Sequence, residues 1–136
     1  MLFGGDSMAG LLARGIAAAP VGATPLEAVG NALDAVRREA FSPARRQLAA
    51  RRRAVIAANP ELKEREALKG LSLTAAMTGA LTRRGVPETV SFVAAHLGLL
   101  AMSIAYGRWA ETTDGGEFGD IARRVLSELQ AASGSY

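Results

Sequence analysis

The uncharged run from Val90 to Gly107 limits the choice of fold more than any other part of the chain. Such a run could cross a membrane, form the core of a soluble domain or present a surface to a partner. A transmembrane helix needs about 20 predominantly apolar residues. This run is at the lower limit of that length and contains His96, two serines and several small residues. We therefore expect a helix of a soluble protein and no membrane span.

The composition narrows the class of protein. A chain of 136 residues fits one domain with a real core. The absence of cysteine excludes a disulfide framework and thiolate chemistry. A net charge of +3 is too small to indicate nucleic-acid binding by itself. Arg14 interrupts the apolar part of the N-terminus, which does not resemble a signal peptide, so we expect a cytoplasmic protein.

The local signals are those of helices, and no segment alternates apolar and polar residues as a strand does. Thr24-Pro25-Leu26-Glu27 and Asn59-Pro60-Glu61 combine a capping residue with proline at the first helical position. Gly85 after two arginines indicates a helix end. We predict an all-α, six-helix bundle forming one domain over 1–136, with a flexible tail at 133–136. The expected helices span about 6–19, 25–40, 43–58, 60–84, 87–112 and 117–132.

The expected helix 87–112 is apolar nearly all round, which is unusual in so small a domain. Burying part of it against a second copy would explain this pattern, and the alternative is a central helix inside a monomer. A stripe of small residues would let a partner helix approach closely, and helix 117–132 adds an amphipathic face. We predict a homodimer through these two helices, with its interface at Ala94, Gly98, Ala101, Ala105, Ile121, Val125 and Leu129.

Catalytic and metal sites are not indicated. Gly5-Asp6-Ser7 resembles the Gly-Asp-Ser block of one esterase class, but a nucleophilic serine needs a histidine base and a group that orients it. His96 is the sole histidine and has no acid beside it. Asp6-Ser7 is more typical of a helix cap. One histidine and no cysteine also argue against a metal site. We expect no enzyme and no cofactor.

Arg51 stands out among the basic residues. Arg45, Arg46, Arg52 and Arg53 pair up on a helical wheel and are expected to be solvated, whereas Arg51 falls beside Leu48 and Val55 on the apolar arc. A buried arginine needs a partner. That partner is either an internal carboxylate, Glu39 or Glu66, or the acidic end of a ligand. His96 is either a hydrogen-bonded core residue or a polar contact in a cavity. The candidate ligand residues are Arg51, Met77, Leu81, His96, Met102 and Trp109.

Three segments carry a family resemblance. The stretch from Ala50 to Glu66, the turn from Arg83 to Glu88 and the helix end from Ala105 to Trp109 resemble the C-terminal regulatory domain of TetR-type transcriptional repressors. In order and length the resemblance covers about residues 3–132. It implies a helical domain that binds a small ligand and dimerises through its last two long helices. It implies that DNA is read by a separate N-terminal helix-turn-helix domain, which this sequence lacks, so specific operator binding by this chain is not expected.

Two functions follow from these observations. The first is the ligand-sensing and dimerising domain of a TetR-type regulator. Its ligand would be small and mostly apolar, with or without an acidic group. The second is a helical homodimeric structural or interaction protein without a ligand. A cavity bounded by helices 25–40, 60–84 and 87–112 favours the first function, and a solid core there favours the second.

Overall fold

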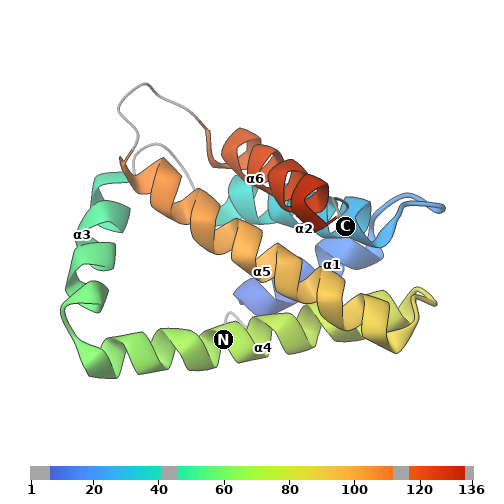
Figure 1. The fold of residues 1–136 in the computed structure, drawn as a ribbon, viewed down its shortest axis with the longest axis horizontal. Helices are drawn as coiled ribbons and strands as arrows, with labels where there is room; N and C mark the ends of the chain where they lie inside the picture. The colour runs from blue at the N-terminus through green and yellow to red at the C-terminus, as the bar shows by residue number, and fades with distance from the viewer. Residues whose placement is uncertain (1–6, 41–45, 112–116, 134–136) are drawn as a thin grey trace.

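The protein is all-helical where its computed structural model describes it, namely residues 7–40, 46–111 and 117–133, without the side chains of 37–40 and 133. Six helices and no strand occur in these ranges (Figure 1). The predicted all-α fold class is therefore confirmed. The helices are α1 Met8–Ala17, α2 Pro25–Ala40, α3 Arg46–Ala57, α4 Pro60–Arg83, α5 Glu88–Glu111 and α6 Phe118–Ser133.

Local capping fixes several of these helix ends. The Ser7 hydroxyl accepts a hydrogen bond from the Gly10 amide at 3.1 Å, so Ser7 caps α1. Thr24 and Glu27 form the predicted capping box, in which each side chain accepts from the backbone amide of the other, at 3.1 and 2.8 Å. Asn59 caps α4 ahead of Pro60. The expected helix start at residue 43 lies outside the described residues.

Two further features close the turn between α4 and α5. Gly85 follows α4 with φ +93°, a left-handed conformation that suits glycine at a helix end. The neighbouring Arg84 reaches a different helix, because its guanidinium donates hydrogen bonds to the carbonyls of Ile16 at 3.1 Å and Ala19 at 3.0 Å. These carbonyls lie at and just beyond the end of α1, where the helix supplies few further amide donors, and that of Ile16 also accepts from the Ala19 amide at 3.1 Å. The turn is thereby tied to the end of α1.

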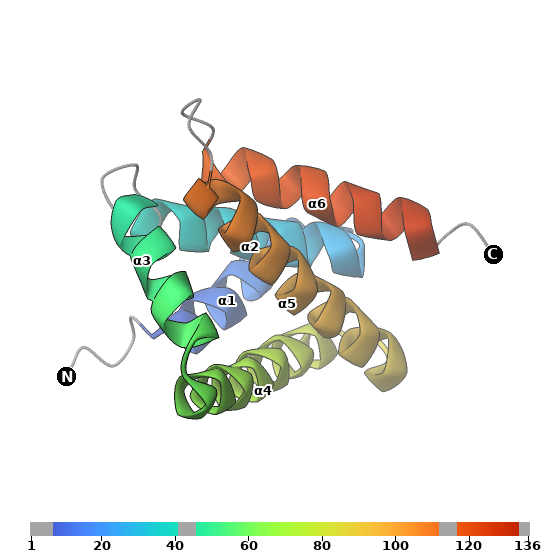
Figure 2. The same ribbon diagram turned by 60° about the vertical axis from the view of Figure 1, so that its left-hand side comes forward.

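Helix α5 is the centre of the fold and contacts α2, α3, α4 and α6 (Figures 1 and 2). Helix α1 lies against both α2 and α4. The closest packing is between α1 and α2, where a Cβ at Gly15 would lie 2.5 Å from the Cα of Ala32. The core is built from small and aliphatic residues around Trp109 and Phe118, whose rings meet edge to face at 6.2 Å.

Helix α3 lies across the ends of α4 and α5 and is oriented unexpectedly. Its buried residue is Ala49, while Leu48 and Val55 are 62% and 57% exposed. The apolar arc expected to point inward therefore faces solvent. Arg51, which was placed on that arc, is exposed, and its predicted burial is wrong. The reason is that α3 packs through Ala49 and the long side chains of Arg46 and Arg53, which fill the distance to α5 that aliphatic residues would otherwise fill.

Candidate functional site

The structure separates the six residues predicted to bind a ligand. Met77, Leu81, Met102 and Trp109 are buried in the core. His96 lies on the exposed side of α5, and Arg51 lies on the outer side of α3. Of the two alternatives for His96, the buried core residue does not agree with its exposure. The six side chains therefore do not line one cavity in this structure.

The space beside Met77 is filled. A Cβ at Gly98 of α5 would lie 2.7 Å from Cγ1 of Val29 and 3.3 Å from Sδ of Met77. Helices α2, α4 and α5 thus meet at Gly98 without room for another group. The region where the sequence predicted a ligand cavity is solid core at this point.

The residues predicted for the dimer interface mostly face other helices of the same chain. The small stripe of α5 is buried, as are Ile121 and Val125 of α6, and Leu129 is half-buried. Helices of the same protomer cover them in this structure, and an interface through them stays a prediction. The small side chains do allow close helix approach, as expected, but the approaching helices include α2 and α4 of the same protomer. The buried small stripe consists of Ala94, Gly98, Ala101 and Ala105.

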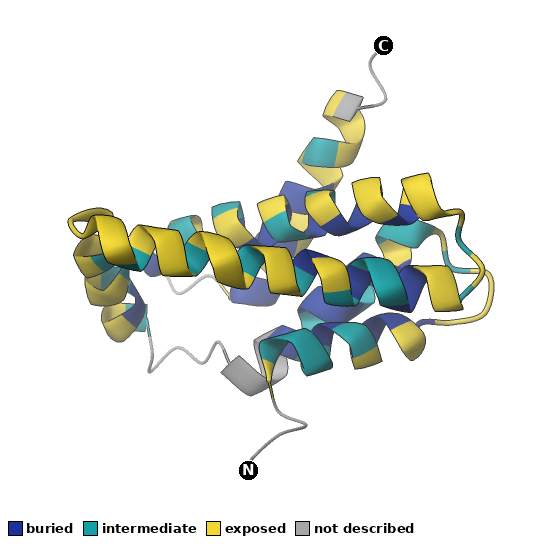
Figure 3. Cartoon of the chain, turned by 90° about the horizontal axis from the view of Figure 1, so that it is seen from below, coloured by how far each residue is buried: buried dark blue, intermediate teal, exposed yellow. Residues whose placement is uncertain are grey.

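An apolar surface that the sequence placed in the interior is exposed on α5. The α5 face consists of Val90, Phe92, Val93 and Leu100, which are 47%, 56%, 51% and 46% exposed. Figure 3 shows exposed residues, in yellow, along α5. Of the residues in the most apolar 18-residue stretch of α5, 39% are buried. Length and composition alone would let α5 cross a membrane, but a core helix of a soluble protein passes the same test. The contacts of α5 with four other helices agree with a core helix.

The exposed surfaces of α4 and α6, which lie next to α5, differ in polarity. On α4, the exposed Leu68 and Leu71 continue the apolar surface, and Gly70 between them packs on Leu99 of α5. On α6, the exposed side is polar and includes Arg124 and Glu128. Exposed apolar side chains are therefore shared between α5 and α4 rather than between α5 and α6.

His96 belongs to this surface and is ordered by its own helix. Its Nδ1 lies 2.8 Å from the carbonyl oxygen of Phe92, and the two rings are 4.1 Å apart. Because a carbonyl only accepts, Nδ1 carries the hydrogen. Nε2 is the ring nitrogen left to face outward contacts.

A second feature is the α3 arginine cluster, formed by Arg46, Arg52 and Arg53. The guanidinium carbon of Arg46 lies 5.6 Å from the ring centroid of Trp109, within cation–π range. Arg52 bonds Glu66 of α4 at 2.5 Å, and Arg53 bonds Glu111 of α5 at 3.0 Å. Three residues expected to be solvated thus connect α3 to α4 and α5. These roles were not predicted from the sequence, although Arg46 and Arg53 share a helical face with Ala49.

The pKa of Arg52 reflects the groups that surround its guanidinium. Partial burial acts to lower its pKa, but the hydrogen bond and charge of Glu66, with smaller contributions from Tyr106, outweigh it and raise the pKa above the ordinary arginine value. Glu66 and Tyr106 thus favour the charged form of the Arg52 guanidinium, and Glu66 binds it directly.

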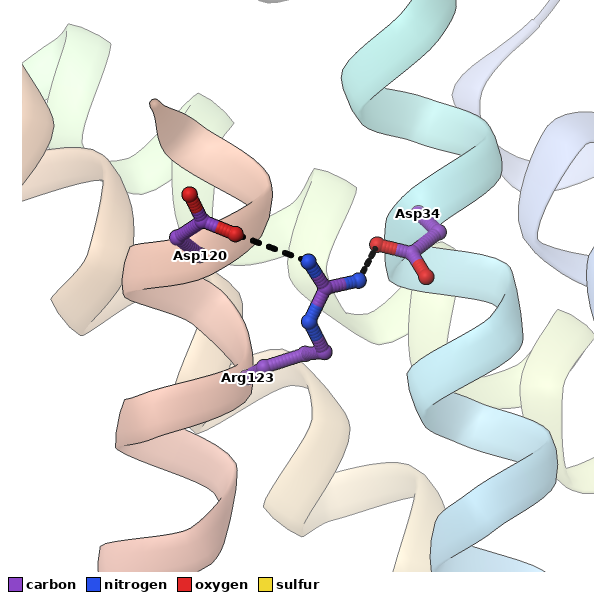
Figure 4. Close-up of polar contacts among 3 residues, drawn as sticks. All are labelled: Asp34, Asp120 and Arg123. Atoms are coloured by element: carbon purple, nitrogen blue, oxygen red, sulfur yellow. Dashed lines mark hydrogen bonds and ion pairs between the residues drawn. The ribbon is translucent and has the colours of Figure 1, made fainter. Parts of the chain in front are cut away.

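An open groove of about 810 Å³ lies on the other side of the molecule, between α2, α6 and the loop that joins α1 to α2. Its wall includes Asn31, Leu126 and the ion pair between Asp34 and Arg123. Arg123 also bonds Asp120, so one guanidinium links α2 to α6 (Figure 4). The hydrogen bond of Asp120 and the charge of Asp34 raise the pKa of Arg123. The groove shares no residue with the predicted ligand site.

Catalytic and metal chemistry finds no support among the described residues. Ser7 acts as a helix cap, as the sequence suggested. Within 7–40, 46–111 and 117–133, no group of three or more His, Asp or Glu side chains could hold a metal ion. Comparison of the chain with protein-family models and with curated proteins gave no match.

Proposed function

We propose that this chain is a homodimeric, ligand-responsive regulatory domain of the TetR type, in which DNA is read by a separate helix-turn-helix domain. The observation that carries the proposal is the α5 face, an apolar surface on the central helix of the fold. Exposed apolar patches of this kind mark interaction sites on soluble proteins. The resemblance of the helix order and turns to TetR-type regulatory domains supplies the regulatory role.

The α5 face itself favours a second copy as the partner. It is apolar and carries no charged side chain, so it is complementary to the same face of another copy. The charged Glu88 and Arg108 are exposed at opposite ends of α5, and Arg108 bonds Glu128 of α6 at 3.2 Å. A two-fold axis in the plane of the interface, perpendicular to α5 near its middle, pairs the two faces antiparallel with the apolar residues at the centre.

The packed core supports a second candidate, a dimeric interaction module without a small ligand. Gly98, Val29 and Met77 pack closely at one point of the region in which the ligand cavity was predicted. Dimerisation is common to both candidates. Ligand binding separates them.

Light scattering of matched variants tests the association. Val93 lies in the α5 face and Val55 on the outer side of α3, with exposures of 51% and 57%. We expect the wild type and Val55→Glu to have the mass of two chains, and Val93→Glu to have the mass of one at the same micromolar concentration. A monomeric wild type, or a dimeric Val93→Glu variant, contradicts association through this face.

A further inference from the structure

The α3 arginine cluster combines charge and aromatic surface in a way that the association of two copies does not use. Arg52 and Arg53 extend from α3 to Glu66 of α4 and Glu111 of α5. Arg53 also packs on the backbone at Gly107, where a Cβ would lie 3.1 Å from its guanidinium. The half-buried ring of Tyr106 contributes to the surroundings of Arg52. Cations and an aromatic surface thus meet at one end of α5.

The carboxylates in this cluster are fewer than the cations bound to them. Lys69 lies 3.6 Å from the same Glu66 oxygen that Arg52 binds. Arg52, Arg53 and Lys69 therefore share two carboxylates, which leaves an excess of one positive charge among these five groups. An additional or replacing anion is electrostatically favoured at this place.

The existing ion pairs can exchange their carboxylates. The side chains of Arg52 and Glu66 are 48% and 37% exposed, and those of Arg53 and Glu111 are 41% and 74% exposed. Exposed pairs of this kind contribute little net stability, because water competes for both charges. An external carboxylate can therefore take the place of Glu66 or Glu111 without disrupting the core.

We propose that the α3 arginine cluster binds an organic carboxylate with an apolar body, whose carboxylate bonds Arg52 in place of Glu66 and whose body packs against Tyr106. A carboxylate is favoured over a phosphate because carboxylates are the groups that Arg52 and Arg53 hold in the structure. Arg–carboxylate pairing is directional, and the fork of an arginine fits it better than an ammonium does. The proposal rests on the proposed ligand-responsive function and names its ligand class.

Binding at this place would change the contacts that hold α3 against α4 and α5. The pair Arg52–Glu66 ties α3 to α4, and Arg53–Glu111 ties it to α5, so exchange of either carboxylate loosens one of these ties. Arg46 of the same helix lies over Trp109, the sole tryptophan of the chain. Movement of α3 therefore changes the environment of a single fluorescent residue.

The test uses the full chain and titrates Trp109 fluorescence with octanoate, the uncharged octanamide and inorganic phosphate at constant ionic strength. We expect octanoate to bind, and octanamide and phosphate to bind at least about tenfold more weakly, since each lacks one half of the proposed interaction. Arg52→Gln should weaken octanoate binding by about tenfold or more. Arg51→Gln is the matched control, because Arg51 lies on the same helix but points outward, and it should bind like the wild type.

A variant that is expected to tighten octanoate binding separates effects on the site from effects of misfolding. Glu66→Gln removes the competing carboxylate and should tighten octanoate binding, while circular dichroism checks that every variant is folded. No octanoate binding by the wild type overturns the proposal. An equal loss in Arg51→Gln, equal affinity for phosphate, or weaker binding by Glu66→Gln does so as well. The mass of the wild type reports on association separately, so a failure of this proposal is distinguishable from a failure of the dimer.

Discussion

The guanidinium of Arg84, in the turn between α4 and α5, donates a hydrogen bond to the carbonyl of Ile16 at 3.1 Å, 68 residues earlier in the chain. Further hydrogen bonds run from the same side chain to Ala19 at 3.0 Å and Pro20 at 2.8 Å. One side chain thus satisfies the end of α1 and fixes the α4–α5 turn against it.

Loss of Arg84 should destabilise the fold. We expect Arg84→Met to lower the free energy of unfolding by about 2 kcal/mol, because partly buried carbonyls lose a charged donor. Arg83→Met is the matched control, since Arg83 is exposed and contacts its own helix at Gly79. It should change stability by less than about 0.5 kcal/mol. Urea unfolding measures both, and equal effects of the two variants would show that the bonds to α1 contribute nothing.

The close contact between α1 and α2 leads to a second prediction about stability. A Cβ at Gly15 would lie 2.5 Å from the backbone Cα of Ala32, so Gly15→Ala should cost at least about 2 kcal/mol. Gly30 of α2 is the control, because its Cβ would meet Leu126 at an ordinary 3.7 Å. Gly30→Ala should stabilise the helix by about 0.5–1 kcal/mol. Thermal unfolding should move in opposite directions, and a neutral Gly15→Ala would refute the close packing of α1 on α2.

Gly98 distinguishes the core from an interface. Because its Cβ would clash with Val29 of the same chain, Gly98→Leu should lower the stability of the protomer by about 1–3 kcal/mol. Under conditions where the variant is folded, it should have the same association constant as the wild type by sedimentation. Unchanged stability with weakened association would instead restore the small stripe to the interface.

Local features of the fold were predictable from sequence, and the orientation of the helices was not. The capping box at Thr24 and Glu27 depends on residues three apart, so the sequence pattern contains the whole interaction. Arg84 was read only as a cation at the end of its own helix, because its partners in α1 are far away in sequence. No local pattern contains that contact.

The buried and exposed sides of α3 and α5 could not be predicted either, because they too depend on tertiary contacts. Helix α3 has no strong apolar face, so which side turned inward was decided by contacts with α4 and α5, and Arg51 was placed on the wrong side. Helix α5 is apolar all round, so its periodicity could not tell the buried small stripe from the exposed Val93 and Leu100. The prediction of an apolar helix was sound, and the assignment of its sides required the tertiary structure.

Cross-linking of a single introduced cysteine tests the central claim, pairing of two α5 faces, most directly. The chain has no cysteine, so Leu100→Cys provides a unique thiol near the proposed two-fold axis, and Val55→Cys provides one on the outer side of α3. Helices packed face to face lie about 8–10 Å apart, within reach of a short bis-maleimide. The account predicts a covalent dimer for Leu100→Cys, in high yield at low protein concentration, and monomer for Val55→Cys. Monomer for Leu100→Cys, or equal yields for the two variants, would contradict pairing through α5.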